Sequence, residues 1–470
     1  MAIATVDPTT GKTLAEFDEP TDAELDDRLA RAAEAWAGYR LTSVGQRVGW
    51  LRSAAELLDA DTAEVAAMMT TEMGKTLAAA RAEVGKCSSA LRWYADHGPA
   101  LLAPQPADAA AVGAEQAHVV HHPLGVVLAV MPWNFPLWQA MRFAAPALMA
   151  GNAGLLKHAS NVPQTALYME ALFARAGVPA GVFQTLLISS GRVERVLRDQ
   201  RVVAATLTGS APAGRAVASI AGEELKPTVL ELGGSDPFIV MPSADLGRAA
   251  QVAVAARCLN NGQSCINAKR FLVHADVAAE FGRLFAEGMG ALVVGDPMAK
   301  GTDIGPLATE QGRTDVEEFV ADAVGLGATV VVGGRRPAGP GWYYPPTVLG
   351  GVTPAMRMWS EEVFGPVAAV VAVADLTEAI TIANDHVYGL GSSLWSEDED
   401  ERAVFVRDVQ AGMAFVNGST TSFPELPFGG VKESGYGREL TGAGMYAFTN
   451  AKTVWVGPSG GPGISSAATE

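Results

Sequence analysis

The sequence has few cysteines and a deficit of positive charge. Only 3 of its 470 residues are cysteine, too few for a scaffold built from disulfides. Lysine and arginine number 34 against 51 aspartates and glutamates, giving a formal net charge of -17. This balance excludes a general nucleic-acid-binding protein, which needs a basic face for the phosphates. It also gives no support for binding to an anionic membrane surface.

Long hydrophobic runs are absent as well. The longest apolar stretch, residues 125–138, is interrupted by Pro132, Asn134 and Pro136 and is too short to span a bilayer. The first twenty residues show no basic segment followed by an apolar core, so we expect no secretory signal and a cytoplasmic protein. With 49% hydrophobic and 18% charged residues, the chain is expected to bury a large core.

The order of the predicted elements favours an α/β fold. Residues 21–96 show helical spacing of apolar residues. Between residues 125 and 231, short β-branched segments alternate with helical ones, which predicts a parallel sheet covered by helices on both faces. A second alternating block follows Pro237, so we place a domain boundary near Gly233 and Gly234.

Two side chains are candidates for catalysis. Cys265 lies in NNGQSCINAKR, where small polar and glycine neighbours predict an exposed loop and an accessible thiol. The alternative is a small core residue, the commoner place for a lone cysteine. Glu231 ends the predicted strand of TVLELGGSDP, at the sheet edge where such folds bind ligands, and is a candidate general base. The alternative is a solvated strand end.

Two further motifs are typical of binding sites. TGSAPAG, residues 208–214, follows a strand and opens a helix, the setting in which backbone N–H groups bind pyrophosphate. Gly209 and Gly214 are five residues apart, so the motif is not GxGxxG, and a plain short turn is the alternative. In PWNFP, Asn134 is a candidate donor to an oxyanion, and the alternative is a rigid aromatic turn.

The order of seven motifs is more specific than any single one. They are PWNFP, LKHAS, TGSAPAG, LELGG, GQSC, EEVFGPV and PFGGVKESGYGRE. In this order the chain resembles the aldehyde dehydrogenase superfamily over nearly its whole length. Several stretches are most similar to bacterial succinate-semialdehyde dehydrogenases. In particular, His158 within LKHAS and Ser235–Asp236 directly after LELGG stand where a proline and a lysine are more usual in the superfamily.

The resemblance implies oxidation of an aldehyde to a carboxylate, with hydride transfer to a nicotinamide cofactor. Cys265 matches the family's nucleophile, Glu231 the general base that hydrolyses the thioester, and Asn134 the oxyanion donor. The implied substrate is succinate semialdehyde. The alternatives are glutarate semialdehyde or an aliphatic or aromatic aldehyde and, more remotely, a cofactor-independent thiol esterase.

The resemblance also implies a set of cofactor-binding residues. They are Trp133, Lys157, Ser160, Gly209, Ser210, Gly214, Leu232, Glu362 and Phe364. Relatives that prefer NAD often place a glutamate where Ser160 stands, and that carboxylate would repel a 2′-phosphate. A serine can donate to the phosphate and Lys157 adds positive charge, so NADP is predicted over NAD, with NAD possible. The alternative is that Ser160 is merely small and tolerates both.

A substrate carboxylate requires a cation, and Arg142 matches an arginine that relatives use for it. Its alternative is a surface charge on a helix. Ser422 is the predicted hydroxyl partner, and Phe428 and Trp138 are predicted to wall the substrate tunnel. A second arginine of some relatives is replaced by Leu259 here. No metal site is predicted.

The implied fold is two Rossmann-like parallel-sheet domains with a small β oligomerisation arm. We assign residues 1–102 and 124–233 to the dinucleotide-binding domain and 234–446 to the catalytic domain. Residues 103–123 and 447–460 are assigned to the arm, and 461–470 to a flexible tail. KTVWV has the alternation of an exposed strand, and such a strand leaves an unpaired sheet edge. Pairing with another subunit removes that edge, so a homodimer or homotetramer is expected.

Overall fold

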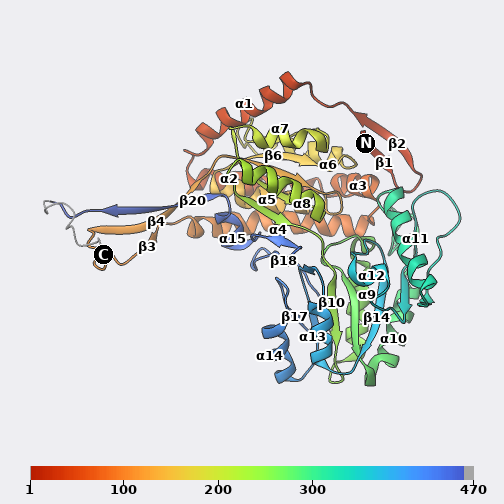
Figure 1. Cartoon of the computed structure of the whole chain (residues 1–470). Helices are drawn as coiled ribbons and strands as arrows, with labels where there is room; N and C mark the ends of the chain where they lie inside the picture. The colour runs from red at the N-terminus through yellow and green to blue at the C-terminus, as the bar shows by residue number, and fades with distance from the viewer. Residues whose placement is uncertain (1, 460–470) are drawn as a thin grey trace.

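Two large sheets organise the structure, a computed structural model that describes residues 2–459 (Figure 1). The first has six strands in the order β19-β9-β8-β5-β6-β7, and the second has seven in the order β12-β13-β14-β11-β10-β16-β17. Neighbouring strands are parallel except at the β19–β9 and β12–β13 edges. The α/β fold with two Rossmann-like sheets is therefore confirmed.

The first sheet and its helices form the upper lobe in Figure 1. Its strands are β5 (Val126–Met131), β6 (Ala153–His158), β7 (Phe183–Thr185), β8 (Val202–Thr208), β9 (Thr228–Glu231) and β19 (Gly435–Tyr436). The helices are α1 (Asp22–Tyr39), α2 (Val44–Ala60), α3 (Thr62–Met73), α4 (Leu77–Leu101), α5 (Trp138–Ala150), α6 (Pro163–Arg175), α7 (Val193–Arg198), α8 (Ala211–Glu223) and α15 (Thr441–Tyr446). An N-terminal hairpin, β1 (Ile3–Asp7) and β2 (Lys12–Phe17), precedes them. Central strands β5 and β6 are almost entirely buried, as expected for a sheet covered on both faces.

The second sheet forms the lower lobe. Its strands are β10 (Asp236–Val240), β11 (Ala268–His274), β12 (Thr329–Val332), β13 (Thr347–Gly350), β14 (Val367–Val373), β16 (Ser393–Trp395) and β17 (Phe415–Val416). The helices are α9 (Leu246–Cys258), α10 (Ala275–Gly290), α11 (Glu310–Gly325), α12 (Arg357–Ser360), α13 (Leu376–Asn384) and α14 (Glu399–Asp408). A small separate pair joins β15 (Tyr388–Gly389) to β18 (Val431–Lys432).

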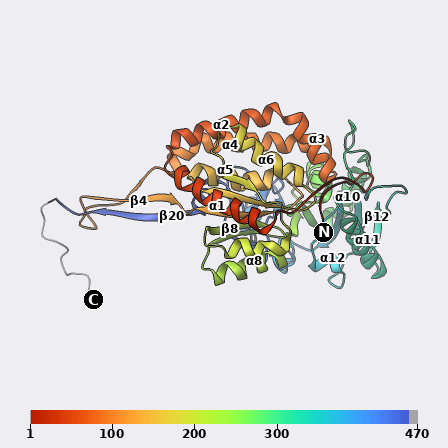
Figure 2. The ribbon, with the colours of Figure 1, turned by 90° about the horizontal axis from the view of Figure 1, so that it is seen from above.

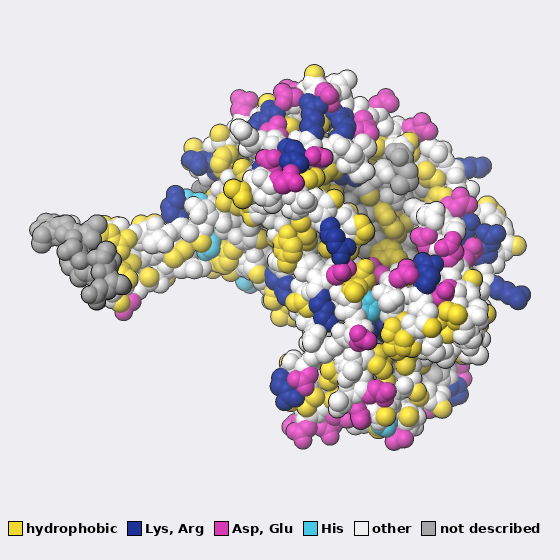
Figure 3. All heavy atoms as spheres, in the orientation of Figure 1, with side chains coloured by type: hydrophobic (Ala, Val, Ile, Leu, Met, Phe, Trp, Pro, Cys, Tyr) yellow, Lys and Arg dark blue, Asp and Glu magenta, His cyan; other side chains and the backbone are white. Residues whose placement is uncertain are grey.

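A three-stranded antiparallel arm projects from the upper lobe (Figures 1 and 2). It consists of β3 (Gln105–Pro106), β4 (Gln116–Pro123) and β20 (Thr449–Val456), with β20 at one edge. Trp455 is 47% exposed and Val456 40% exposed. In Figure 3 both signs of charge are spread over the lobes, whereas the visible face of the arm carries few charges. The predicted tail, residues 461–470, lies outside the described residues.

The change from one sheet to the other falls between Glu231, which ends β9, and Asp236, which begins β10. Because of this change, we propose that the boundary between the two domains lies between residues 233 and 234. One segment departs from a simple division, because β19 pairs Gly435 with Glu231 and so extends the first sheet. Residues from the predicted catalytic domain thus complete the edge of the dinucleotide-binding sheet.

Strand register gathers the site at one sheet edge. Thr208 at the end of β8 pairs with Glu231 at the end of β9, and β5 on the other side of β8 ends at Met131, just before PWNFP. Carboxyl ends of parallel strands form the crevice where α/β folds bind ligands.

Candidate active site

Cys265 lies where two cavities meet. The first, of about 250 Å³, we call the glycine-loop cavity, and its lining residues are Pro132, Trp133, Asn134, Gln139, Thr208, Gly209, Ser210, Leu232, Gly233, Cys265, Glu362 and Phe364. The second, of about 240 Å³, we call the α4 cavity, and it includes Ala79, Ala82, Glu83, Lys86, Phe135, Trp138, Gln139, Arg142, Leu259, Cys265, Ser422 and Phe428. A thiol shared by both cavities can react with a molecule in one while facing a second molecule in the other.

The loop that carries Cys265 is held in an unusual backbone conformation. Asn260, Asn261 and Gly262 have φ values of 57°, 58° and 77°, a left-handed region that asparagine and glycine tolerate best. The Asn261 amide donates to the Gly74 and Pro306 carbonyls at 2.9 and 3.0 Å. These bonds attach the loop to the residue after α3 and to the segment before α11.

The expectation of an exposed loop is wrong. Residues 260–264 are buried and Cys265 is half-buried. Two cations that the sequence analysis missed satisfy the loop's carbonyls, which makes this burial possible. Lys269 Nζ donates to the Cys265 carbonyl at 2.9 Å, and Arg257 donates to the Gly262 carbonyl at 2.8 Å.

Burial raises the pKa of the Cys265 thiol to about 12. The carboxylate of Glu362 acts in the same direction, whereas Lys269 and Arg142 oppose it. The thiol is therefore protonated at neutral pH in the cofactor-free protein, and the reactive thiolate is a small fraction.

Alkylation of the cofactor-free enzyme tests this protonation state. Well below the thiol pKa the thiolate fraction rises tenfold per pH unit, so inactivation by iodoacetamide should accelerate about tenfold from pH 7 to 8 and again from 8 to 9. The measurement is the rate of activity loss at each pH, with substrate turnover assayed after dilution to one common pH. A rate that levels off below pH 8 would show a depressed pKa and contradict the structure.

Glu231 lies at the predicted strand end but does not line either cavity. Its side chain turns toward Gly429, where an added Cβ would lie 2.6 Å from Oε1. Burial raises the pKa of Glu231 well above its usual range, and the neighbouring Glu439 adds to the shift. This shift favours the protonated form of the Glu231 carboxyl in this conformation, and the group can act as a base only after it loses that proton.

Asn134 lines the glycine-loop cavity beside Cys265 and is buried. Its Nδ2 donates to the Gln263 carbonyl at 3.1 Å, and its own backbone carbonyl accepts from the Asn260 amide at 2.6 Å. An amide nitrogen carries two hydrogens, so one N–H remains for an oxygen bound near Cys265.

Six of the nine predicted cofactor residues line the glycine-loop cavity, namely Trp133, Gly209, Ser210, Leu232, Glu362 and Phe364. Trp133 and Phe364 meet edge to face with ring centroids 5.7 Å apart. Ser210 caps α8, its hydroxyl accepting from the Ala213 N–H at 3.4 Å. Pro212 has no N–H and the Ala213 and Gly214 N–H groups are already bonded to Ser210, which leaves the Ala211 N–H at the start of α8 for a phosphate group. With the glycine and the aromatic side chains of the cavity, the residues present fit a dinucleotide.

The other three predicted cofactor residues lie outside this cavity. Gly214 has a packing role, because a Cβ there would lie 2.6 Å from Leu232 Cδ2. Lys157 is the residue before the last of β6 and pairs with Val130 of β5. Among the described residues Lys157 forms no ion pair, and the Ser160 carbonyl accepts from the Ala4 N–H at 2.9 Å.

All four predicted substrate residues line the α4 cavity with Cys265. The surface-charge alternative for Arg142 is wrong, because this side chain is 3% exposed and forms an ion pair with Glu439. Sequence reasoning missed Lys86, which also lines the cavity. The missed signal is the spacing 79, 82, 83 and 86 on α4, which places four residues on one helix face.

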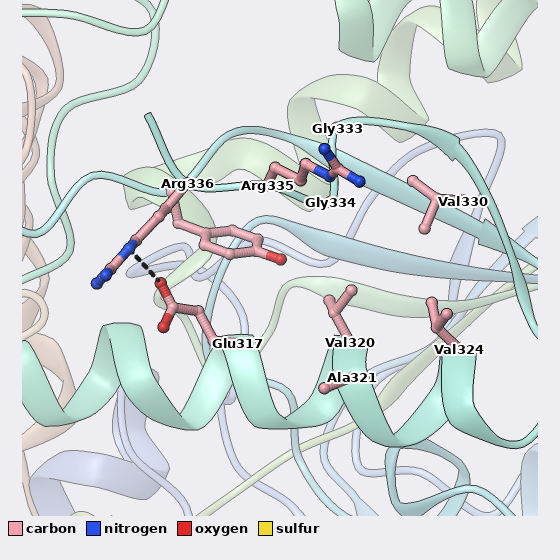
Figure 4. Close-up of a pocket in the computed structure, with 10 residues that line it drawn as sticks. Glu317, Val320, Ala321, Val324, Val330, Gly333, Gly334, Arg335 and Arg336 are labelled. Atoms are coloured by element: carbon pink, nitrogen blue, oxygen red, sulfur yellow. Dashed lines mark ion pairs between the residues drawn. The ribbon is translucent and has the colours of Figure 1, made fainter. Parts of the chain in front are cut away.

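A third cavity lies away from Cys265. It measures about 570 Å³ and is lined by residues of α11, β12 and the segment that follows, including Glu317, Arg335 and Arg336 (Figure 4). Arg336 pairs with Glu317 at 3.6 Å. None of the predicted site residues lines it. Within residues 2–459 there is also no cluster of three or more potential metal ligands and no helix long and apolar enough to cross a membrane.

A cysteine that lines both a cavity suited to a dinucleotide and a second, largely apolar cavity is the arrangement expected of a thiol-dependent oxidoreductase. The profile of the aldehyde dehydrogenase family matches residues 1–454, and the chain belongs to that family.

Individual relatives are similar over nearly the whole chain. The chain is 60% identical over 460 residues to a protein of Mycobacterium avium named succinate-semialdehyde dehydrogenase [NADP(+)], with 98% of each covered. It is 60% identical over 456 residues to a Mycobacterium tuberculosis H37Rv protein of the same name, numbered 1, covering 97% of this chain and all of that protein. The crystal structure of a Streptococcus pyogenes succinic semialdehyde dehydrogenase in complex with NADP+ has a TM-score of 0.94 and 38% identity, with 97% of this chain and 100% of that chain covered.

Proposed function

We propose that this aldehyde dehydrogenase oxidises succinate semialdehyde to succinate with NADP as the hydride acceptor. The observation that carries the proposal is the position of Cys265 at the junction of the two cavities. The names of relatives at 60% identity support the substrate and the cofactor.

In the proposed reaction the Cys265 thiolate attacks the aldehyde carbon. The oxyanion that forms accepts hydrogen bonds from the free N–H of the Asn134 amide and from the Cys265 backbone N–H. Bound NADP supplies the acceptor for the hydride that leaves this carbon. Collapse of the thiohemiacetal leaves an acyl group on Cys265 as a thioester.

Hydrolysis of the thioester requires a base, and we assign this role to Glu231. The carboxyl group must swing from Gly429 toward Cys265 and release its proton, because the structure places it outside both cavities. As a carboxylate near the thioester, it would take a proton from the attacking water.

We propose NADP rather than NAD because of two residues that match the family's adenosine-ribose site. Lys157 supplies a positive charge there, and Ser160 stands where NAD-preferring relatives often have a glutamate. Lys157, near the end of β6, forms no ion pair within the described residues. Burial lowers its pKa, whereas the Glu19 carboxylate is near enough to raise it. Ser160 lies in the connection between β6 and α6. A glutamate at 160 would repel the 2′-phosphate, whereas serine can donate to it.

Turnover of purified protein with succinate semialdehyde and butyraldehyde, each with NADP and NAD, tests the function. We expect the highest kcat/KM with succinate semialdehyde and NADP, and we expect Ser160→Glu to lower the NADP-to-NAD ratio by about tenfold or more, the scale of one lost charged hydrogen bond. A higher kcat/KM with butyraldehyde would contradict succinate semialdehyde as the substrate. Turnover without any nicotinamide would contradict an oxidation that uses this cofactor.

We also propose a homo-oligomer, dimer or tetramer, assembled through the arm and working in the cytoplasm. The exposed edge of β20 and the exposed Trp455 support an intersubunit role for the arm. The three cysteines are free thiols, as is usual in a reducing compartment.

A further inference from the structure

We propose that His158, the last residue of β6, is a positioning residue that sets the direction of the connection to α6 and so places Ser160 for the 2′-phosphate of NADP. The proposal deepens the proposed function and rests on it. His158 then contributes to the preference for NADP over NAD by acting through Ser160.

His158 has no part in the chemistry of the proposed reaction. It stands where a proline is more usual in the superfamily. Its side chain is 5% exposed and lines neither of the two cavities that contain Cys265. Burial of a polar side chain costs free energy unless its polar atoms are hydrogen-bonded, so the bonds of the imidazole indicate what it does.

Both ring nitrogens of His158 are bonded. Nδ1 accepts from the backbone N–H of Ala159 at 2.9 Å. An accepting Nδ1 carries no proton, so the neutral ring carries its hydrogen on Nε2, which donates to the Pro136 carbonyl at 2.7 Å. Burial lowers the pKa of His158 to about 4, against the opposing effect of the bond to Pro136. The ring is therefore neutral at pH 7 and keeps both bonds.

The two bonds fix how the chain leaves β6. They run in series from the Ala159 N–H through the imidazole to the Pro136 carbonyl. Ala159 is the first residue after the strand, and Ser160 is the next. A proline at position 158 would restrict the backbone through its own ring, whereas His158 restrains the following residues through its side chain.

The connection after His158 lies beside the glycine-loop cavity. Ala159 and Trp133 pack against the same small apolar cluster, which includes Val162 and Ala308. Trp133 lines the glycine-loop cavity. A change in the direction of the chain at Ala159 therefore moves Ser160 relative to a dinucleotide bound there.

The Pro136 end of this link is held independently of His158. Glu83 Oε1 accepts from the backbone N–H groups of Leu137 and Trp138 at 2.9 and 2.8 Å. Asn134 is bonded to the loop that carries Cys265. The segment with the proposed oxyanion donor thus keeps its own contacts when His158 is replaced.

The connection has fewer contacts of this kind near its start. The Ser160 carbonyl accepts from the Ala4 N–H at 2.9 Å. Farther along, Glu72 accepts from the N–H groups of Gln164 and Thr165 at 2.8 and 3.1 Å, at the start of α6. Loss of the His158 bonds should therefore displace Ser160 more than Asn134, and so alter cofactor selection more than hydride transfer.

The test is the ratio of the Kd for NAD to the Kd for NADP, measured without aldehyde by quenching of tryptophan fluorescence. Trp133 lines the cavity and serves as a probe. His158→Asn is too short to reach Pro136, so the ratio should fall about 3- to 10-fold, the scale of one hydrogen bond. His158→Phe keeps a ring of similar size without either bond, and its ratio should fall at least as far.

Two further variants serve as matched controls. His158→Gln can place an amide N–H near the position of Nε2, so its ratio should stay within about twofold of the wild type, since the donor to Pro136 is kept. His97→Asn changes an exposed histidine on α4 and should leave the ratio at the wild-type value.

A double-mutant cycle shows whether His158 acts through Ser160. Ser160→Ala should lower the ratio by itself, and His158→Asn added to it should cause no further loss, because the positioned hydroxyl is already absent. Equal weakening of NADP and NAD in His158→Asn and His158→Phe, an unchanged ratio in both, or additive losses in the double variant would overturn the role of His158. A wild type that binds NAD as tightly as NADP would instead overturn the cofactor of the proposed function, so the two failures are distinct.

Discussion

Replacement of Cys265 by alanine should reduce NADPH formation from any aldehyde by at least about a thousandfold, because no other group can form the covalent intermediate. The substitution removes only a sulfur atom at the junction of two cavities. The folded structure should therefore persist, and the thermal unfolding midpoint should stay close to that of the wild type. Initial rates and thermal unfolding are measured on the same preparation.

Cys258→Ala is the matched control for the Cys265 substitution. Cys258 is buried at the end of α9, with its sulfur 3.5 Å from the sulfur of Met289, and lines neither cavity. Its removal should leave the rate near the wild-type value. Full activity in Cys265→Ala would contradict the assignment of the nucleophile.

Substitution of Glu231 by glutamine should separate the two halves of the reaction. The first half, thiolate attack and hydride loss, does not use this carboxyl as the base for water. Rapid mixing should therefore produce a burst of about one NADPH per active site, followed by a steady state slower by about 10²- to 10⁴-fold, the usual contribution of a general base. Stopped-flow absorbance of NADPH measures both phases.

Glu425→Gln serves as the control for Glu231→Gln, since Glu425 is exposed on the segment before PFGG. It should show wild-type rates in both phases. Loss of the burst itself in Glu231→Gln would mean that Glu231 acts before hydride transfer, for example by taking the thiol proton.

Much of the site was predictable because its residues belong to short motifs. Asn134, Glu231 and Cys265 each lie in a segment whose glycine, proline or strand-end context has a local physical meaning. The structure places Asn134 and Cys265 on one cavity wall, and Glu231 at the neighbouring strand end. Local sequence also predicted the alternation of strands and helices, and hence both sheets.

Contacts between distant segments were not predictable. The ion pair of Arg142 with Glu439 joins α5 to the segment before α15, and no local pattern couples these residues. Lys86 belongs to no motif, and its hydrogen bond to the Ser422 hydroxyl joins α4 to a segment near the other end of the chain. The loop of Cys265 has a polar sequence because its side-chain amides donate to carbonyls inside the protein. Composition alone does not distinguish such a buried polar loop from one exposed to solvent.

Gly214 illustrates a related ambiguity. A glycine after a strand, at the start of a helix, suits close approach to a phosphate, and the sequence left this role and a plain short turn both open. The structure shows that the space beside Gly214 is filled by Leu232, so the glycine lets α8 pack against the strand end. Both roles require a missing Cβ, and the sequence does not separate them.

The most direct test of the central claim is to identify the acyl group and the residue that carries it. Glu231→Gln protein is mixed with NADP and succinate semialdehyde, quenched in acid during the slow phase, digested and analysed by mass spectrometry. We expect a succinyl group on the peptide that contains Cys265, and none when NADP is omitted. A succinyl group on another residue, or NADPH formation without acylation of Cys265, would contradict the account.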